Sequence, residues 1–235
     1  MYQISIIIPV YNEAQHVKRL LKHLEAASTT QHIKEVLFVD GGSTDTTLES
    51  LNALSSTQFK IVVLESPQGR AKQMNVGAQH ASGSIYYFLH VDSFPPKQFD
   101  EYILQHCQKK QQAGCFRIQF KSNHWWLKFT GWLTRFNWLI CRGGDQSLFV
   151  KASLFHRLQG YNEDYTIYED NAFIRKLYHQ TNFVVIQQPL MTSARRYEEF
   201  GVWKLQYVYF KIHLKYWMGA SPKELLKYYR KQFHL

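Results

Sequence analysis

Short apolar runs alternate with helical periodicity through the first 93 residues, and this alternation restricts the fold more than any other feature of the chain. The runs are Ile4–Val10, Glu35–Val39, Lys60–Leu64 and the stretch Ile85–Ser93. Strands that alternate with helices over short turns form a parallel sheet with right-handed crossovers. We therefore predict an α/β fold with a Rossmann-like, mostly parallel sheet flanked by helices.

The helices between these strands are expected from the spacing of apolar residues. Two segments show the pattern: the first carries Val17, Leu20, Leu21 and Leu24 on one face, and the second carries Leu48, Leu51 and Leu54 after N-cap candidates Ser43 and Thr44. A third helix is expected over about 70–79, after Gly69.

The stretch Ile85–Ser93 contains His90, Val91 and Asp92 directly after five apolar or aromatic residues. In open α/β sheets, ligands bind in the crevice outside the carboxyl ends of the strands. A carboxylate in that place, with an imidazole two residues before it, suits a divalent cation that bridges phosphate oxygens. An Asp that only caps the turn before the next two prolines is the alternative, and this stretch by itself does not decide between them.

The ends of the first two strands carry groups that suit a nucleoside. Tyr11 follows the first strand, and an aromatic ring there can stack on a base. The carboxylates of Glu13 and Asp40 can accept hydrogen bonds from a base imide or a ribose hydroxyl. Gly41 and Gly42 allow the backbone to approach a ligand closely. Turn chemistry would explain each residue alone, whereas their arrangement at one edge indicates a nucleotide.

The end of the third strand adds positive charge to the same edge. Arg70 and Lys72 stand at the start of the helix that follows this strand. The positive end of a helix dipole also attracts anions, so these side chains suit a pyrophosphate. A solvated basic helix face is the simpler alternative.

The rest of the chain is less regular. We expect helices over 96–107 and 169–179 and strands over 115–120, 146–150 and 183–186. No linker rich in Pro, Gly or Ser divides the chain. We therefore predict one domain over 1–235, in which 1–93 bind the nucleotide ligand, 94–200 form the second wall of the cleft and 201–235 form basic, aromatic C-terminal helices.

The charge and cysteine content restrict partners and compartment. Lys and Arg number 28 against 18 Asp and Glu, a net charge of +10, which favours anionic partners such as phosphorylated ligands and anionic lipid surfaces. No nucleic-acid-binding motif is found, so nucleic acid is not a predicted partner. Three unevenly spaced cysteines predict reduced thiols in a cytoplasmic protein. Neither a secretory signal nor an apolar run of about 18 residues is found.

Two segments, His124–Arg142 and Trp203–Met218, are dense in aromatic residues and also carry basic ones. Such helices suit a membrane interface or an anionic lipid, which would make the protein peripheral on the inner face of the membrane. Core helices whose lysines reach solvent are the alternative. The basic residues that share a helix face are His124, Lys128, Arg135 and Arg142 in the first segment and Lys204, Lys211 and Lys215 in the second.

Three blocks of this sequence resemble family 2 of the inverting glycosyltransferases. They are Ile6-Ile7-Ile8-Pro9-Val10-Tyr11-Asn12-Glu13, Val39-Asp40-Gly41-Gly42-Ser43-Thr44-Asp45 and Gly69-Arg70-Ala71-Lys72-Gln73-Met74-Asn75-Val76-Gly77-Ala78. The resemblance is specific over about residues 4–93 and looser over 94–200. The third block, Leu89-His90-Val91-Asp92 and Gly144-Asp145-Gln146 are similar to a small bacterial subgroup of short, stand-alone members. The resemblance implies the GT-A fold and transfer of a sugar from a nucleoside diphosphate donor, usually a UDP-sugar.

The resemblance also implies roles for individual donor-site residues. Asp92 matches the last acid of the family's Asp-x-Asp motif, and His90 occupies the place of the first acid, which implies a divalent Mn or Mg ion. The residues implied to line the nucleoside pocket are Pro9, Tyr11, Glu13 and Asp40. Those implied to lie along the rest of the donor are Gly69, Arg70, Lys72, Asn75 and Val91.

For the acceptor side, the family expects a catalytic base on a Glu-Asp pair at the start of a helix. Glu169 and Asp170 fit this pattern, and Asp170 matches the base; capping of the helix by these acids is compatible with that role. Four further residues, which a turn or a basic surface would also explain, are candidates for contact with the acceptor or the diphosphate: Asp145, Gln146, Arg195 and Arg196. The Gln-x-x-Arg-Trp motif of processive members is absent, which argues against a polymer synthase.

These observations predict a metal-dependent, inverting glycosyltransferase that acts on a sugar or lipid-linked acceptor. Two alternatives remain at this point. One is a nucleotide-sugar-binding protein without transfer activity, because His90 replaces an acid. The other is a nucleotidyltransferase, although no glycine-rich activating loop follows the first strand.

Overall fold

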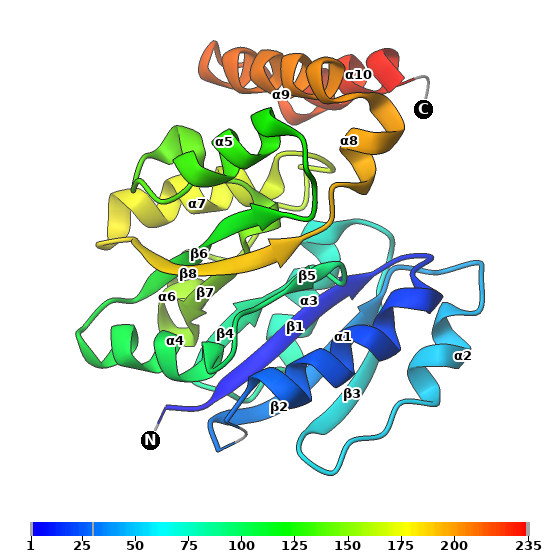
Figure 1. Ribbon diagram of the computed structural model, residues 1–235, viewed down its shortest axis with the longest axis vertical. Coiled ribbons are helices and arrows are strands. Elements are labelled where there is room, and N and C mark those ends of the chain that lie inside the picture. The colour runs from blue at the N-terminus through cyan, green and yellow to red at the C-terminus, as the bar shows by residue number, and fades with distance from the viewer. Residues whose placement is uncertain (1, 30, 234–235) are drawn as a thin grey trace.

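The first four strands run parallel, as the alternation of strands and helices predicts. In the computed structural model, which describes residues 2–29 and 31–233, they form one side of an eight-stranded sheet with the order β3-β2-β1-β4-β7-β6-β8-β5 (Figure 1). These four strands are β1 (Ile4–Val10), β2 (Ile33–Asp40), β3 (Lys60–Glu65) and β4 (Ile85–Phe88).

The other side of the sheet mixes directions. β7 runs antiparallel to β4 and to β6, β8 runs parallel to β6, and the short β5 pairs antiparallel with β8. The prediction of an α/β fold with a mostly parallel sheet is confirmed. The strands on this side are β5 (Ser93–Phe94), β6 (Ala113–Phe120), β7 (Leu148–Lys151) and β8 (Val184–Thr192).

Helices cover both faces of the sheet, and α9 and α10 lie together at the end of the molecule farthest from the N-terminus (Figure 1). Among the described residues, no helix has both the length and the apolar character needed to cross a bilayer. The helices are α1 (Ala14–Ala27), α2 (Thr47–Asn52), α3 (Arg70–His80), α4 (Phe99–Gln108), α5 (Trp125–Leu133), α6 (Ala152–Arg157), α7 (Glu169–Gln180), α8 (Arg195–Phe200), α9 (Val202–Trp217) and α10 (Pro222–Phe233), with single 3-10 turns at Leu139–Cys141 and Gly144–Gln146.

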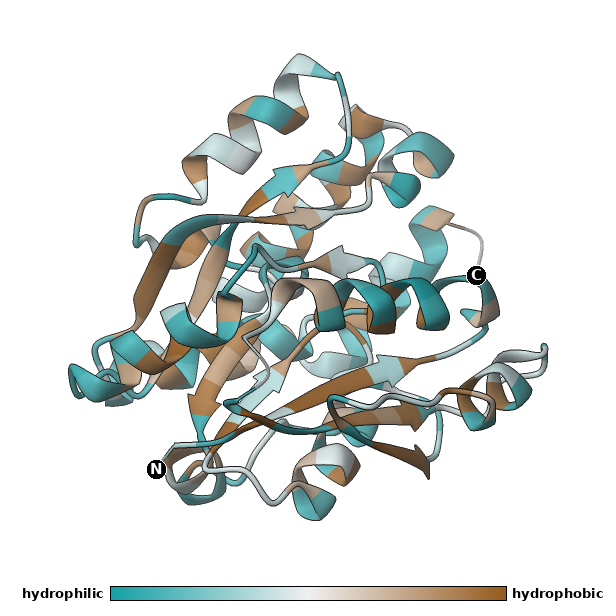
Figure 2. Ribbon diagram, turned by 60° about the horizontal axis from the view of Figure 1, so that its bottom comes forward, coloured by the Kyte–Doolittle hydropathy of each residue, from teal (hydrophilic) through white to brown (hydrophobic). Residues whose placement is uncertain are grey.

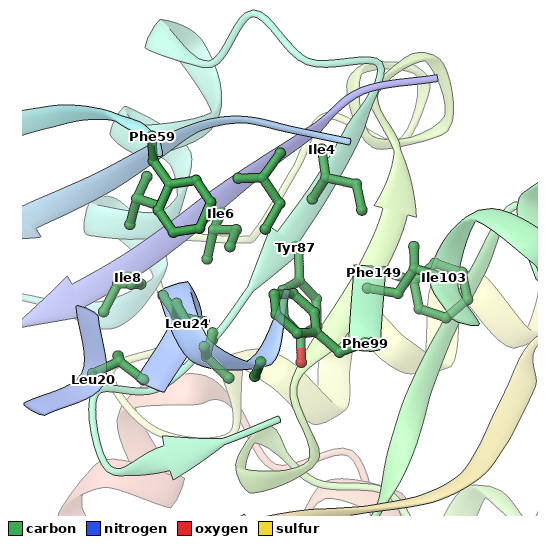
Figure 3. Packing of buried hydrophobic residues seen from close by; sticks show 14 of the residues in the cluster. Ile4, Ile6, Ile8, Leu20, Leu24, Phe59, Tyr87, Phe99, Ile103 and Phe149 are labelled. Atoms are coloured by element: carbon green, nitrogen blue, oxygen red, sulfur yellow. The ribbon is translucent and has the colours of Figure 1, made fainter. Parts of the chain in front are cut away.

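The core has two layers because successive side chains of a strand point to opposite faces. Ile6 and Ile8 of β1 pack with Leu24 of α1 in one cluster, whereas Ile7 packs with Met74 of α3 in the other. Figure 3 shows side chains of the first cluster around Tyr87. The ring of Tyr87 stacks on that of Phe99, with 5.6 Å between the ring centroids. The central strands are accordingly the most continuously hydrophobic elements (Figure 2).

The second helix begins later than its N-cap candidates predict. α2 starts at Thr47, and the hydroxyl groups of Ser43 and Thr44 do not cap it. The Asn12 amide instead donates to Ser43 Oγ at 2.9 Å, and the Thr44 amide donates to Asn12 Oδ1 at 2.9 Å. These residues therefore join the loops after β1 and β2.

The aromatic segment 124–142 is not one helix. α5 ends at Leu133, and Thr134 Oγ1 accepts a hydrogen bond from the backbone amide of Ile118. The buried guanidinium of Arg142 then donates to the carbonyls of Thr134 and Phe136, both at 2.6 Å. Arg142 thus stabilises a reversal of the chain and does not extend the predicted basic face.

The last strand is longer than the predicted 183–186 and extends to Thr192. Thr192 pairs with Phe120 on one side and with Ser93 on the other. This pairing brings the segment that follows β8, including Arg195, to the strand ends where His90 and Asp92 lie.

Candidate active site

A tight turn presents two side chains at the carboxyl end of β4. The Ser93 amide donates to the carbonyl of His90 at 3.0 Å and closes the turn. The side chain of Val91 points into the core and is 5% exposed, so Val91 can meet a ligand only through its backbone. The imidazole of His90 and the carboxylate of Asp92 are left at the edge of the sheet.

The loop after β2 is held by its own carboxylate. Asp40 is buried, and its Oδ2 accepts hydrogen bonds from the backbone amides of Gly42 at 3.0 Å and Ser43 at 2.9 Å. The ring of Tyr11, in the neighbouring loop after β1, is exposed and makes no ring contact with another described residue. Tyr11 is therefore free to stack on a base, while Asp40 shapes the loop beside it. Pro9 is buried within β1.

One residue of this region, Gln73 of α3, was not singled out from the sequence. Its Nε2 donates to the carbonyl of Val10 at 2.7 Å and to that of Val39 at 2.8 Å, so one amide joins the ends of β1 and β2. A Cβ atom on Gly41 would lie 2.9 Å from the amide of Gln73, so a larger residue at position 41 would have to displace this doubly hydrogen-bonded amide. In the sequence, its signal was its position on a predicted helix within the third block that resembles the family.

The N-terminus of α3 carries the two predicted diphosphate contacts. Gly69 precedes the helix with φ +136°, a conformation that L side chains rarely adopt. Arg70 and Lys72 follow in the first turn, and the side chain of Arg70 is half-exposed. The backbone amides, the helix dipole and both side chains can therefore act on one anion.

The two acids of the second half of the chain lie against the two basic residues of the first half. Glu169 and Asp170 occupy the first turn of α7 and are both buried. Arg70 Nη1 lies 3.9 Å from Glu169 Oε1, and His90 Nε2 lies 3.8 Å from Asp170 Oδ2. The helix dipole also stabilises a negative charge at this position.

Burial and charge shift the pKa values of these groups. Burial, together with the charge of Asp170, raises the pKa of Glu169 to about 7, although Arg70 opposes the shift. Burial and Arg70 would lower the pKa of His90, but contact with Asp170 outweighs them and the pKa lies above its usual value. Burial raises the pKa of Asp92, against the opposing effect of His90.

Asp145, in the 3-10 turn before β7, is exposed. Its charge contributes to the raised pKa of both His90 and Asp92, so it lies close enough to act on this edge. Gln146, next to it, is fully buried, and its Oε1 accepts a hydrogen bond from the Gly143 amide at 3.4 Å. The side chain of Asp145 is therefore accessible to an acceptor, whereas that of Gln146 is not.

The two predicted arginines after β8 diverge. Arg195 reaches the edge of the site, where its Nη2 lies 2.7 Å from Glu13 Oε1, and Glu13 also contacts His16 Nδ1 at 2.7 Å. Arg196 turns away, donates to the hydroxyl of Tyr229 and lies over its ring. Of these two arginines, only Arg195 lies at the edge of the site, where it engages Glu13.

Asn75 is not brought to this group of side chains. Its Nδ2 donates to the carbonyl of Tyr161 at 2.9 Å and its Oδ1 accepts from the Tyr161 amide at 3.0 Å. Both polar atoms of its amide are used to fasten α3 to the loop before α7. The predicted contact between Asn75 and the donor is therefore replaced by a structural role.

One carboxylate of this site, that of Asp92, suits the implied divalent cation. Within residues 2–29 and 31–233, no group of three or more His, Cys, Asp or Glu side chains is arranged to hold a metal ion. Magnesium in nucleotide sites is bound through one or two carboxylates together with substrate phosphates. The part-buried carboxylate of Asp92 suits that arrangement, whereas Nε2 of His90 faces Asp170.

Comparisons with known proteins assign this arrangement to a family. The model of Glycosyl transferase family 2 matches residues 5–179. Glycosyltransferase AglE of Haloferax volcanii is 35% identical over 100 residues, which are 42% of this chain and 33% of that protein. An undecaprenyl-phosphate 4-deoxy-4-formamido-L-arabinose transferase of Sodalis glossinidius is 27% identical over 209 residues, 85% of this chain and 61% of that protein. The chain thus spans about a third of the length of the first relative and less than two thirds of the second.

Solved structures show the same fold at low sequence identity. A mannosyltransferase from Pyrobaculum calidifontis, solved with GDP-Man and Mn2+, has a TM-score of 0.73 and 16% identity over 98% of this chain and 70% of that one. TarS 1–349 of S. aureus, solved with UDP-GlcNAc, has a TM-score of 0.66 and 19% identity over 81% of this chain and 58% of that one. The expected GT-A fold is confirmed.

Proposed function

Because the chain belongs to glycosyltransferase family 2, we propose that it transfers a sugar, with inversion, from a nucleoside diphosphate sugar to an acceptor hydroxyl. The observation that carries the proposal is the contact of Arg70 with Glu169 and of His90 with Asp170. These contacts join the edge suited to a nucleotide with the acid pair suited to an acceptor.

In this proposal, the donor lies along the carboxyl ends of β1, β2 and β4. Tyr11 stacks on the base, the loop of Asp40 accommodates the ribose, and Arg70, Lys72 and Arg195 neutralise the diphosphate. Asp92 would hold a divalent Mn or Mg ion, which, when bound, would stabilise the negative charge of the departing diphosphate.

Asp170 acts on the acceptor. The acceptor oxygen attacks the anomeric carbon from the face opposite the diphosphate, and Asp170 removes the hydroxyl proton. The bond between the anomeric carbon and the diphosphate oxygen breaks, and the nucleoside diphosphate leaves with both electrons. Asp145 orients the acceptor. His90 positions the carboxylate of Asp170, and Glu169 contacts Arg70 beside it.

We further propose that the acceptor is attached to a lipid. Several relatives carry the name undecaprenyl-phosphate 4-deoxy-4-formamido-L-arabinose transferase, which supports a lipid-linked substrate. The three cysteines are free thiols, which suits a reducing compartment and therefore the cytoplasm, at the inner face of the membrane.

Donor binding and turnover test the proposal separately. Ligands that bind the folded state raise its apparent stability, so thermal unfolding with UDP-, GDP- and dTDP-sugars should identify the donor in the presence of Mn2+. Nucleoside diphosphate release with membrane lipid extract as the acceptor source then measures turnover. Asp92→Asn should lose the part of donor binding that depends on Mn2+, and Asp164→Asn, an exposed acid in the loop before α7, is the control.

The results of these two measurements distinguish a transferase from a nucleotide-sugar-binding protein. A stability shift with turnover supports the transferase. Donor binding without release from any donor or extract would favour a binding protein, and the absence of binding to every nucleotide sugar would contradict the proposal.

A further inference from the structure

The large apolar side chains that remain exposed are concentrated in two segments. All six tryptophans of the chain lie within 125–138 and 203–217. Of the exposed large hydrophobic side chains in the described part of the chain, every one except Tyr11 lies within 125–140 or 203–218. Contiguous exposed apolar patches on soluble proteins mark sites of interaction.

α9 has two apolar faces where a surface helix normally has one. Its inner face, with Leu205, Val208 and Ile212, is buried against α10 and neighbouring elements. The opposite face is exposed and repeats at intervals of four and three residues, so that one stripe runs along the helix. The stripe consists of Trp203, Tyr207, Phe210, Leu214 and Trp217.

α5 continues the same surface. Trp125, Phe129 and Trp132 are exposed at the same spacing, while Leu127 is buried. The ring of Trp203 lies 5.2 Å from that of Trp126, so the two helices meet through aromatic contacts. We call the exposed side chains of α5 and of the α9 stripe the aromatic surface.

The charged residues within the two aromatic segments are all basic. At 100° per residue, Lys204, Lys211 and Lys215 line one flank of the α9 stripe, and neither 121–142 nor 201–218 contains Asp or Glu. No described residue forms an ion pair with these lysines or with Lys128 of α5. Glu224 of α10 is near enough for Lys215 to help lower its pKa, but it forms no ion pair with that lysine. The surface therefore combines exposed indole and phenol rings with an excess of positive charge.

A groove beside α5 extends this positive character. Its volume is about 820 Å³, and its walls include Arg117, Lys121 and Lys128 together with Trp132. A single acid, Glu198, also lines it. Such a groove suits an anionic group next to an apolar phase.

We propose that the aromatic surface docks on an anionic lipid membrane. Tryptophan and tyrosine are enriched at membrane–water interfaces, and basic residues beside them are attracted to anionic lipids. A second copy of the chain is a poor match because it would bring two rows of lysine together. This inference rests on the proposed function in one respect only: the lipid-linked acceptor of that proposal is the substrate that the docked protein would meet at the membrane.

The inner side of α9 connects this surface to the proposed base. Tyr168, which immediately precedes Glu169 and Asp170, has its hydroxyl 2.6 Å from His213 Nδ1 of α9. Its ring also lies 4.7 Å from that of Tyr216. Docking through the outer face of α9 therefore holds the membrane next to the loop that presents Asp170.

Flotation of the full chain with vesicles tests the proposal. We expect binding to vesicles of phosphatidylcholine with phosphatidylglycerol, and binding at least about tenfold weaker to phosphatidylcholine alone, because several lysines contribute. Since all six tryptophans lie in these two segments, brominated lipids should quench the intrinsic fluorescence on binding.

Two charge-matched variants locate the surface. Lys204→Glu/Lys211→Glu should weaken binding to the anionic vesicles by about tenfold or more, whereas Lys18→Glu/Lys22→Glu, which alters exposed lysines of α1 by the same charge, should weaken it much less. Phe210→Ser/Trp217→Ser should weaken binding to both kinds of vesicle. Thermal unfolding of each variant shows that it is folded.

Absence of vesicle binding by the folded chain would overturn the proposal, as would equal losses in the two charge variants. Dimers in sedimentation that do not bind vesicles would assign the surface to self-association instead. Flotation requires no donor and donor binding requires no vesicles, so failure of this proposal is distinguishable from failure of the proposed function.

Discussion

Nε2 of His90 lies 3.8 Å from Oδ2 of Asp170, which joins the turn after β4 to the first turn of α7. The resemblance implied that His90 replaces a metal-binding acid. In the structure, the imidazole faces the proposed base, and both side chains are largely buried. His90 is therefore a positioning residue for Asp170 in our interpretation.

Replacement of His90 tests this interpretation. His90→Gln removes the imidazole that faces the Asp170 carboxylate, and misplacement of a catalytic group lowers turnover, so kcat should fall by about tenfold or more. The KM for the donor should change little, and steady-state kinetics would measure both constants. A large rise in KM at unchanged kcat would assign His90 to donor or metal binding.

Asp170→Asn removes the proposed base and keeps the shape of the side chain. Turnover should fall by about 10²-fold or more, since general base catalysis typically contributes that much. Donor affinity, measured by thermal shift, should remain close to that of the original chain, and Asp164→Asn serves as the control. Near-normal turnover would show that the acceptor oxygen needs no base, as with a phosphate, or that another group is the base.

The raised pKa of Glu169 gives stability a dependence on pH. Between its ordinary pKa of 4.5 and about 7, folded Glu169 holds a proton that the unfolded chain releases. Its contribution to the free energy of unfolding is therefore fully present below pH 4.5 and is lost as the pH rises through about 7.

Glu169→Gln should remove this dependence because the amide does not ionise. Urea unfolding at several pH values should show the variant gaining on the order of 3 kcal/mol relative to the original chain as the pH rises through this window. Glu49→Gln, at an exposed position of α2, should show no such trend. Parallel pH profiles for the original chain and Glu169→Gln would contradict the assignment.

The divergence of the two neighbouring arginines predicts different defects. Arg195→Ala removes the contact with Glu13 and the proposed diphosphate contact, so the KM for the donor should rise about tenfold, equivalent to about 1.4 kcal/mol. Arg196→Ala removes the contacts with Tyr229 and should lower the free energy of unfolding by about 1 kcal/mol without changing KM. Kinetics and urea unfolding of both variants would separate the roles, and interchanged effects would refute them.

Much of the sheet edge that we propose binds the donor could be predicted from the sequence, because the carboxyl ends of parallel strands lie at the same edge of a sheet. Tyr11, Arg70 and Asp92 follow strands of the regular first half and Asp40 ends one, so the local pattern predicted that they lie at one edge. The start of α7 was also predicted, and with it the position of Asp170.

Contacts that depend on tertiary packing could not be predicted. No local sequence pattern indicates that His90 faces Asp170. None indicates that Arg195 and Arg196, which are adjacent in the sequence, contact different partners. The end of α5 was missed because it depends on the guanidinium of Arg142, which folds back on carbonyls several residues earlier. The structural use of Asn75 likewise depends on a loop in the other half of the chain.

The amide of Gln73 has a consequence for how this site can change over evolution. It donates to the carbonyls of both Val10 and Val39, and it fills the space that a Cβ on Gly41 would need. A larger residue at position 41 would displace this amide or favour a shorter residue at position 73, and in either case the two hydrogen bonds that join the loops would be lost together. The two positions are therefore coupled: their substitutions should be non-additive in a double-mutant cycle, and the loops after β1 and β2 should diverge together.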